Sequence, residues 1–350
     1  FFFFFHHEMA CRLPFLISKG PLTSIYFVFF ISILAAPDKL AETLSVVSKY
    51  INIPGSTEIT LEVNPASASF EKLQSFKQTG INRISLGFQS TSQRILTRLG
   101  RNHSADDSLL AYHDARKAGF KNISVDLIFS VPQQTLKELD DDLLTLKSLN
   151  PEHISLYELT YYQGTRFEKD VRRGHIIPIS EDVSADFMFH IEEILENNGY
   201  IHYETSNYGK EGYQSLHNQL YWQSASYLGV GPGAHSTLRE KSHAIRWESR
   251  RQLKGYLEQW RSPKEPSVPN NHDQGITYFE ELTSLHLFKE TIMGAMRTRS
   301  GLYMDDIPEN FHSLLYKGLS PALEYGWVEK NGSHIVPTPK GMACADALAL

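Results

Sequence analysis

The sequence predicts an α/β fold, a partial barrel of parallel strands, and two observations lead to this prediction. Short apolar segments end in polar side chains just before loops, and stretches with the spacing of amphipathic helices separate them. Strands and helices that alternate in this order are typical of a right-handed parallel sheet. The carboxyl ends of such strands form one rim, where functional side chains gather.

Four segments are expected to be strands because each is rich in apolar and β-branched residues and is bounded by turn-forming ones. They are EITLEVNP at 58–65, RISLGFQS at 83–90, ISVDLIFSVP at 123–132 and HISLYELT at 153–160. A poorer strand is expected within 25–34. Five strands are too few to close an eight-stranded barrel, so the predicted barrel is partial.

The helices between these strands are predicted from their starts and their apolar spacing. Pro37 opens the first helix, and Phe70, Leu73 and Phe76 mark the next. Capping-box pairs begin two more, Ser104 with Asp107 and Thr135 with Glu138. A further helix is expected at 184–198.

The remaining chain predicts a smaller second module. A helix is expected at 278–296, then short helices near Met304 and Leu314 and a hairpin on the Asn331-Gly332 turn. This order suggests a winged-helix-like domain. The expected divisions are an atypical Phe-rich segment 1–36, a partial barrel with its extension 37–240, a linker 241–275 and a C-terminal domain 276–350.

The first 36 residues differ from the rest. They begin with five Phe rather than Met, and their apolar run at 25–36 is too short to cross a bilayer. We expect either a truncated or faulty beginning, or a strand that stands in for a lost one. Two distant cysteines give no disulfide framework, so the chain is expected to be cytoplasmic or mitochondrial rather than secreted.

Charge indicates which partners to expect. The formal net charge is -6, and the arginines of the C-terminal module are interspersed with acidic residues. Nucleic-acid binding normally needs a basic face, so neither a nucleic-acid partner nor a membrane span is expected.

A ligand site is expected at the rim of the predicted sheet. Glu62, Gln89, Asp126 and Glu158 each end a strand, and Arg101 follows the second of them. Carboxylates, an amide and a guanidinium suit a zwitterionic ligand that carries hydroxyl groups. Two alternatives remain: these groups cap helices or pair with arginines, or the three carboxylates hold a divalent cation for hydrolysis, although no His joins them.

Eight short motifs occur in order along the chain. They are LEVNP (61–65), NRISLGFQS (82–90), LTRLGRNH (96–103), SVDLIFSVPQQT (124–135), HISLYELTYYQGT (153–165), YETSNY (203–208), SLHNQLYW (215–222) and YLGVGPGAHS (227–236). As an ordered set they resemble the radical S-adenosylmethionine proteins of the oxygen-independent coproporphyrinogen III oxidase group, within it the haem chaperone (HemW) branch. The resemblance covers about 37–345, and its HNxxYW signature falls on His217, Asn218, Tyr221 and Trp222.

The resemblance implies a partial (β/α)6 radical-SAM-type barrel followed by a HemN-type C-terminal domain. By motif position, S-adenosylmethionine would be contacted by Glu62, Gln89, Arg101 and Asp126. It also implies haem as a ligand that awaits transfer to an apo-haemoprotein. His217 is the first candidate for the haem iron and His235 the second.

The chain departs from the family pattern where the iron-sulfur cluster should be held. Family members bind a [4Fe-4S] cluster through a CxxxCxxC loop, whereas this sequence has only Cys11 and Cys344. No glycine-rich GGGTP turn precedes Pro37, and the first strand with its cluster loop is missing. No metal ligands are therefore assigned.

We expect a HemW-like protein of porphyrin metabolism that binds haem and S-adenosylmethionine without radical activity. The alternatives are a coproporphyrinogen III oxidase-type oxidoreductase and a non-functional product of a misassembled gene model.

Overall fold

The main sheet of the computed structural model is a curled α/β half-barrel, which confirms the predicted fold class. The structure describes residues 1–28, 36–273 and 275–348. The strand order is β1-β2-β3-β4-β5-β7-β6; β1 to β5 are parallel, and β7 is antiparallel to both of its neighbours. The strands are β1 Ser24–Phe27, β2 Glu58–Val63, β3 Arg83–Gln89, β4 Ile123–Phe129, β5 His153–Glu158, β6 Ile201–Glu204 and β7 Asn207–Gly209.

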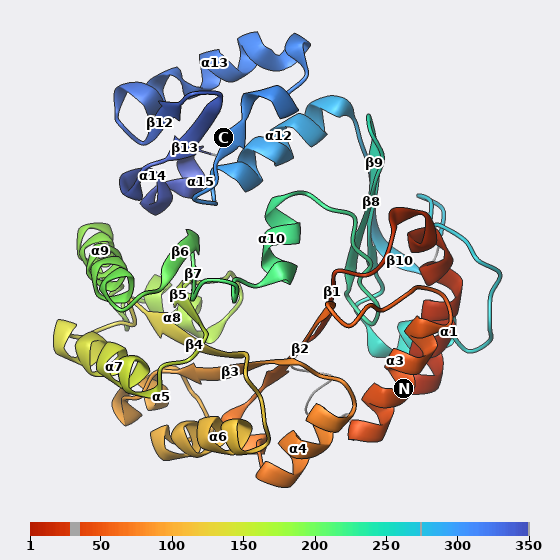
Figure 1. The fold of residues 1–350 in the computed structure, drawn as a ribbon, viewed down its shortest axis with the longest axis horizontal. Helices are drawn as coiled ribbons and strands as arrows, with labels where there is room; N and C mark the ends of the chain where they lie inside the picture. Colours follow the sequence, from red (N-terminus) through yellow and green to blue (C-terminus); the bar gives the residue numbers. More distant parts are fainter. Residues whose placement is uncertain (29–35, 274, 349–350) are drawn as a thin grey trace.

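Helices cover the convex face of this sheet, and a short helix, α10, lies on its concave side (Figure 1). Within the ranges given above, none of the helices is long and apolar enough to span a bilayer. The helices of this part are α3 Pro37–Ser48, α4 Phe70–Gln78, α5 Gln93–Arg98, α6 Ala105–Lys117, α7 Leu136–Leu149, α8 Arg166–Arg172, α9 Glu181–Asn197 and α10 Leu216–Trp222.

The predicted elements of the barrel correspond closely to the observed ones. The four expected strands are β2 to β5, and both capping boxes form at the starts of α6 and α7. Of the poorer strand expected at 25–34, residues up to Phe27 lie in β1, whereas 29–35 lie outside the described residues. β1 pairs with β2 in parallel and is the last strand on its side of the described sheet.

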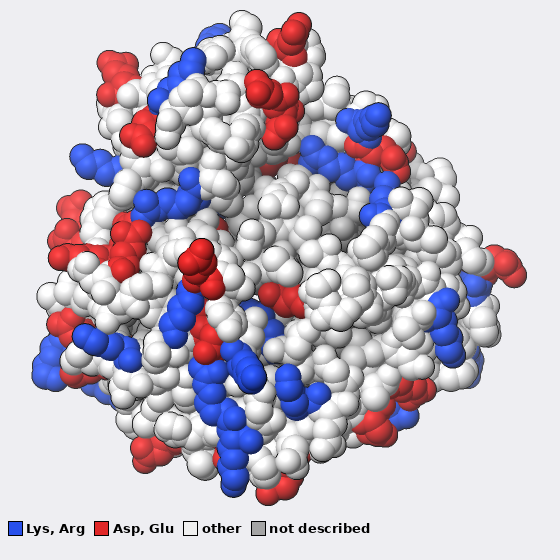
Figure 2. Space-filling model, viewed as in Figure 1, with Lys and Arg blue, Asp and Glu red and all other residues white. Residues whose placement is uncertain are grey.

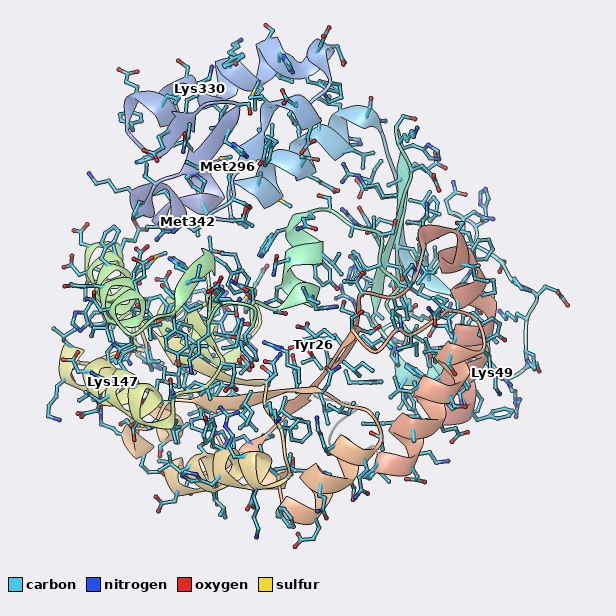
Figure 3. All side chains as sticks on the ribbon, viewed as in Figure 1. Tyr26, Lys49, Lys147, Met296, Lys330 and Met342 are labelled. Atoms are coloured by element: carbon cyan, nitrogen blue, oxygen red, sulfur yellow. The ribbon has the colours of Figure 1, made fainter. Side chains whose placement is uncertain are left out.

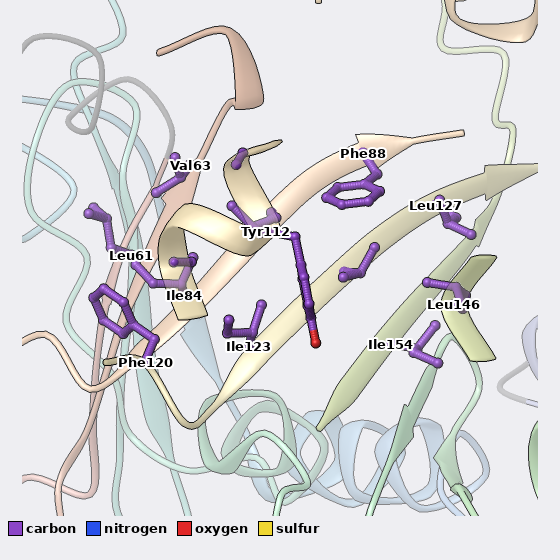
Figure 4. Close-up of a cluster of buried hydrophobic side chains, with 14 of the residues drawn as sticks. Leu61, Val63, Ile84, Phe88, Tyr112, Phe120, Ile123, Leu127, Leu146 and Ile154 are labelled. Atoms are coloured by element: carbon purple, nitrogen blue, oxygen red, sulfur yellow. The ribbon is translucent and has the colours of Figure 1, made fainter. Parts of the chain in front are cut away.

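Successive side chains of each strand point to opposite faces of the main sheet, so that one face is apolar and the other polar. The apolar side chains pack against the outer helices and form the main core (Figure 4). Core residues from four successive strands include Leu61, Ile84, Ile123 and Ile154. The polar side chains at the intervening positions are left to face the inside of the curl.

The N-terminal helix α1 (Phe2–Arg12) and the 3-10 helix η1 (Leu13–Lys19) pack beside a second sheet, β10-β9-β8 (Figure 1). The Glu8 carboxylate is buried there and accepts hydrogen bonds from Gly231 N (2.8 Å), Ser249 Oγ (2.9 Å) and Tyr256 Oη (2.6 Å). The Phe-rich segment is thus joined to residues more than two hundred positions away. This sheet comprises β8 His235–Arg239, β9 Ala244–Ser249 and β10 Ile276–Leu282, with α11 Leu253–Gln259 beside it.

The prediction of one helix over 278–296 is wrong in its first part. Residues up to Leu282 belong to β10, and the helix α12 begins only at Ser284. The strand forms because it pairs antiparallel with β9, a partner that local patterns do not reveal. The range 241–275, expected to be a linker, contains β9 and α11, whereas 260–273 has neither helix nor strand.

In its described residues, the C-terminal module contains the α-helices α12 to α15 and a small sheet of order β11-β13-β12 around its own core. The predicted hairpin forms, because β12 and β13 pair across Asn331 and His334. The elements are α12 Ser284–Ala295, β11 Leu302–Tyr303, η3 Met304–Asp306, α13 Glu309–Glu324, β12 Val328–Asn331, β13 His334–Pro337, α14 Pro339–Ala343 and α15 Ala345–Leu348.

Two adjacent leucines of α7 provide a matched test of this core. Leu143 is 1% exposed and Leu144 is 63% exposed. We expect Leu143→Ala to lower the free energy of unfolding by about 2–5 kcal/mol, because it leaves a cavity. Leu144→Ala should change it by less than about 0.5 kcal/mol. Equal losses in urea unfolding would show that α7 does not pack on the sheet as described.

Candidate functional site

The concave face of the half-barrel is lined by polar side chains, several of them buried. They occupy alternate positions on four neighbouring strands, and paired positions in the register place them side by side. The buried members cannot rely on water, so they need partners within the protein. The set comprises Glu58, Thr60, Glu62, Arg83, Ser85, Ser124, Asp126, His153 and Ser155.

Asp126 and Glu62 lie on this face, as the sequence predicts for a shared site. Ser85 Oγ donates to both Asp126 oxygens (2.8 and 3.0 Å), and Ser124 Oγ donates to one of them at 3.1 Å. Burial nevertheless raises the pKa of Asp126. Glu62 accepts a hydrogen bond from Tyr26 Oη at 3.0 Å. Both carboxylates are partly exposed and could receive a cationic ligand group.

Gln89 lies on the same face as Asp126 and Glu62, and its backbone has an unusual conformation. Its φ is 69°, in the left-handed region, where the strand register also shifts. A Cβ placed on Gly87 would lie 2.7 Å from Gln89 Nε2, so the amide folds back over this glycine. Gly87 lies two residues after Ser85 in β3 and therefore faces the same side of the sheet. The Gln89 amide, which lies over Gly87, is thus on the concave face.

The other two predicted rim residues, Arg101 and Glu158, share no hydrogen bond or ion pair with these three in the part of the chain that the structure describes. Arg101 is exposed, and no hydrogen bond or ion pair joins it to them within the described residues. Glu158 accepts a hydrogen bond from Ser184 Oγ of α9 at 2.5 Å. The strand alternation of β5 turns Glu158 towards the helices, which corrects its expected place at the barrel mouth.

Helix α10, which carries the HNxxYW motif, is attached to the concave face at both ends. The buried Glu58 carboxylate accepts hydrogen bonds from Ser215 Oγ (3.3 Å), Leu216 N (3.1 Å) and His217 N (3.1 Å). At the other end Trp222 Nε1 donates to Glu204 at 3.0 Å. These contacts hold the helix inside the curl of the sheet (Figure 1).

The imidazole of His217 lies against the first strand. Its Nδ1 is hydrogen-bonded to Ser24 Oγ at 3.0 Å, and its ring stacks on Tyr26 with centroids 4.6 Å apart. Figure 3 shows Tyr26 inside the curl, between the sheet and α10. Burial, and then the positive charge of Arg83, lower the pKa of His217 to about 4. His217 is therefore a neutral imidazole at pH 7, the form that binds metal ions.

A largely apolar cavity of about 830 Å³ opens beside β1 and contains both histidines that the sequence singles out, His217 and His235. The rings of Tyr221 and Tyr227 also line it, with centroids 4.7 Å apart. Side chains of α1, η1 and α3 close the opposite wall, among them Phe5, Met9, Leu13, Leu16 and Val47. His235 is exposed, and its Nε2 lies 3.8 Å from the Glu248 carboxylate.

The cysteines do not fit an iron-sulfur cluster. Cys11 is buried beside Tyr256 and Trp260, and its Sγ donates to the Glu265 carbonyl at 3.2 Å. Cys344 follows α14 in the C-terminal module. A cluster needs three thiolates converging on one site. Across 1–28, 36–273 and 275–348, no three Cys, His, Asp or Glu side chains are placed to hold a metal ion.

Sequence reasoning missed the residues that support His217, namely Ser24, Tyr26 and Glu58. It examined only the ends of strands, whereas these residues lie at their beginnings or middles. The available signal was the period-two alternation of EITLEV at 58–63, which places Glu58 on the same face as Glu62.

Charged side chains of both signs are interspersed around the visible surface (Figure 2).

Comparisons with known proteins agree with this architecture. The family model described as the Radical SAM superfamily matches residues 23–146. The chain is 32% identical to a Synechocystis protein named heme chaperone HemW, over 89% of this chain and 74% of that protein. It is 31% identical to the Lactococcus lactis protein of the same name, over 80% and 70% respectively.

Two further comparisons extend this result. A mouse protein named radical S-adenosyl methionine domain-containing protein 1, mitochondrial, is 37% identical over 61% of this chain, which spans about half (48%) of its length. The solved structure of coproporphyrinogen III oxidase (HemN) from Escherichia coli superposes with a TM-score of 0.78, covering 99% of this chain and 81% of that one. At 16% identity this likeness concerns the fold alone.

The environment of His217 predicts how it titrates. Its signal, assigned by its loss in His217→Gln, should titrate with a midpoint near pH 4 in ¹⁵N-edited NMR. In the unfolded chain the group should titrate near its ordinary value of 6.5. The unfolded state therefore binds more protons between these values, and His217 makes the fold less stable as the pH falls from 6.5 to about 4. A midpoint near 6.5 in the folded protein would contradict the burial described here.

Proposed function

Since this chain belongs to the HemW family of the radical S-adenosylmethionine superfamily, we propose that it binds haem in the cavity beside β1 and holds it for transfer to an apo-haemoprotein. The observation that carries the proposal is that His217 and His235, separated by seventeen residues, line the same apolar cavity. The relatives in Synechocystis and Lactococcus lactis bear the name heme chaperone.

The size and lining of the cavity suit a planar macrocycle. A volume of about 830 Å³ falls within the range of ligand pockets. Tyr221 and Tyr227 offer flat faces, and the opposite wall is aliphatic and aromatic. An apolar ring system bound there would remove this surface from water, which favours binding.

His217 can serve as the ligand of the haem iron. Its Nδ1 is occupied by Ser24, while its Nε2 has no hydrogen-bond partner among the described residues. The neutral imidazole needs no deprotonation before it binds iron. His235 is the second candidate, and its Nε2 would have to move away from the Glu248 carboxylate, 3.8 Å from it, to reach the iron.

We also propose that the concave face binds S-adenosylmethionine through Glu62, Gln89 and Asp126, with Arg101 as an exposed fourth contact. The carboxylates suit the ammonium and ribose hydroxyl groups of this ligand, and the guanidinium suits its carboxylate. The two cysteines do not fit a [4Fe-4S] cluster, so no radical step is derived for this chain.

The haem proposal predicts a histidine-dependent absorbance change. Titration of the purified chain with haemin should give a shifted Soret band, and His217→Ala should weaken binding by at least about 10-fold, because the iron loses its ligand. His235→Ala should have a smaller effect.

His113→Ala is the matched control, because His113 is exposed on α6 and does not line the cavity. It should bind haem as the unchanged protein does. The absence of a Soret shift, or equal affinity for the unchanged protein and His217→Ala, would refute the haem site.

The S-adenosylmethionine proposal predicts binding measurable by calorimetry. Asp126→Asn should reduce the affinity by about 10-fold or more, since a charge-assisted hydrogen bond is lost. Asp141→Asn is the control, because Asp141 lies on α7 and pairs with Lys137 on the surface. Affinities equal for all three proteins would argue against ligand contact at Asp126.

A further inference from the structure

We propose that Ser24 and Glu58, at the starts of β1 and β2, are positioning residues that fix the orientation and the tautomer of His217, so that its Nε2 faces the cavity with a free lone pair. This inference rests on the proposed haem site and concerns how the protein prepares the ligand atom. Neither residue is itself a proposed ligand of the haem iron or a proposed contact of S-adenosylmethionine; Ser24 lines the cavity, and Glu58 does not.

The two residues are neighbours in the sheet. Ser24 pairs with Glu58 in the parallel register of β1 and β2, so their side chains lie on the same face. Both bind the start of α10: Ser24 contacts the imidazole, and Glu58 accepts from the backbone of Leu216 and His217. Two paired residues of neighbouring strands therefore hold His217, Glu58 by its backbone N–H and Ser24 by its imidazole.

The carboxylate anchors the helix firmly because it is 7% exposed and satisfied by three donors. Charge-assisted hydrogen bonds of this kind are roughly twice as strong as neutral ones. Stacking on Tyr26 then limits rotation of the ring, with an interplanar angle of 23°. To move Nε2 away from the cavity, the imidazole would have to rotate about its side-chain bonds and lose the contacts with Ser24 and Tyr26.

The Ser24 contact involves the ring nitrogen whose protonation defines the tautomer of His217. The 3.0 Å separation of Nδ1 and Ser24 Oγ suits a proton carried by either atom. In the proposed tautomer the proton is on Nδ1, which donates it to Ser24 Oγ. Nε2 is then unprotonated, and a hydrogen bond from the other ring nitrogen also raises the basicity of a metal-binding imidazole.

The first measurement needs no haem. Long-range ¹H–¹⁵N NMR of the full chain at pH 7 should show His217 with Nδ1 protonated and Nε2 bare. Ser24→Ala should shift the population towards the Nε2-protonated form, and Ser24→Thr, which keeps the hydroxyl, should restore it. An Nε2-protonated ring in the unchanged protein, or a tautomer indifferent to Ser24→Ala, would overturn the proposal.

The second measurement is haem affinity. Ser24→Ala and Glu58→Gln should each weaken binding by about 10-fold or more, as loss of a supporting hydrogen bond does at metal sites. Ser48→Ala is the matched control, because Ser48 is exposed at the end of α3 and does not line the cavity. Equal affinity for Ser24→Ala and Ser48→Ala would overturn the proposal.

The two measurements separate the failure of this inference from that of the haem site. Absence of haem binding together with the expected tautomer would refute the proposed function alone. Should Glu58→Gln not fold, the Ser24 variants still decide the matter, since Ser24 is partly exposed on a short strand at the end of the described sheet.

Discussion

The arrangement of the candidate sites depends on the Glu58 carboxylate, a buried charge at the beginning of a strand. A buried carboxylate is costly unless donors surround it, and here the start of α10 supplies them. Within the described residues, all three hydrogen-bond donors to this carboxylate belong to the start of α10, and no other carboxylate accepts from the start of this helix. The polar inside of the half-barrel thereby sets where the HNxxYW motif lies.

The same helix joins the barrel to the C-terminal module. Trp222 donates to Glu204 of β6, and Arg297 of the C-terminal module lies over the Trp222 ring at 5.8 Å. Backbone bonds continue the connection, since Thr205 N donates to the Arg297 carbonyl at 3.0 Å and Arg299 N to the Tyr203 carbonyl at 3.1 Å. The two modules are thus linked through the element that carries the proposed haem ligand.

The sequence was sufficient for elements whose causes are local. The capping boxes at Ser104 and Thr135 and the four central strands could be predicted, because apolar spacing and cap chemistry act within a few residues. β10 could not be, since it exists through pairing with β9. Of the expected site, Glu62, Gln89 and Asp126 share one face, whereas the orientation of Glu158 depended on packing against α9. The family motifs indicated His217, but its supporting contacts come from β1 and β2, which no spacing rule connects to it.

The attachment of α1 has a consequence for how the polypeptide acquires its structure during synthesis. Glu8 is satisfied by Gly231, Ser249 and Tyr256, and Arg12 lies over the Trp260 ring at 5.3 Å. Helix α1 therefore cannot complete its contacts until Tyr256 and Trp260 have been translated. Contacts so distant along the chain slow folding, because a long loop must close before they form. Until then the apolar side of α1 would be open to chaperones.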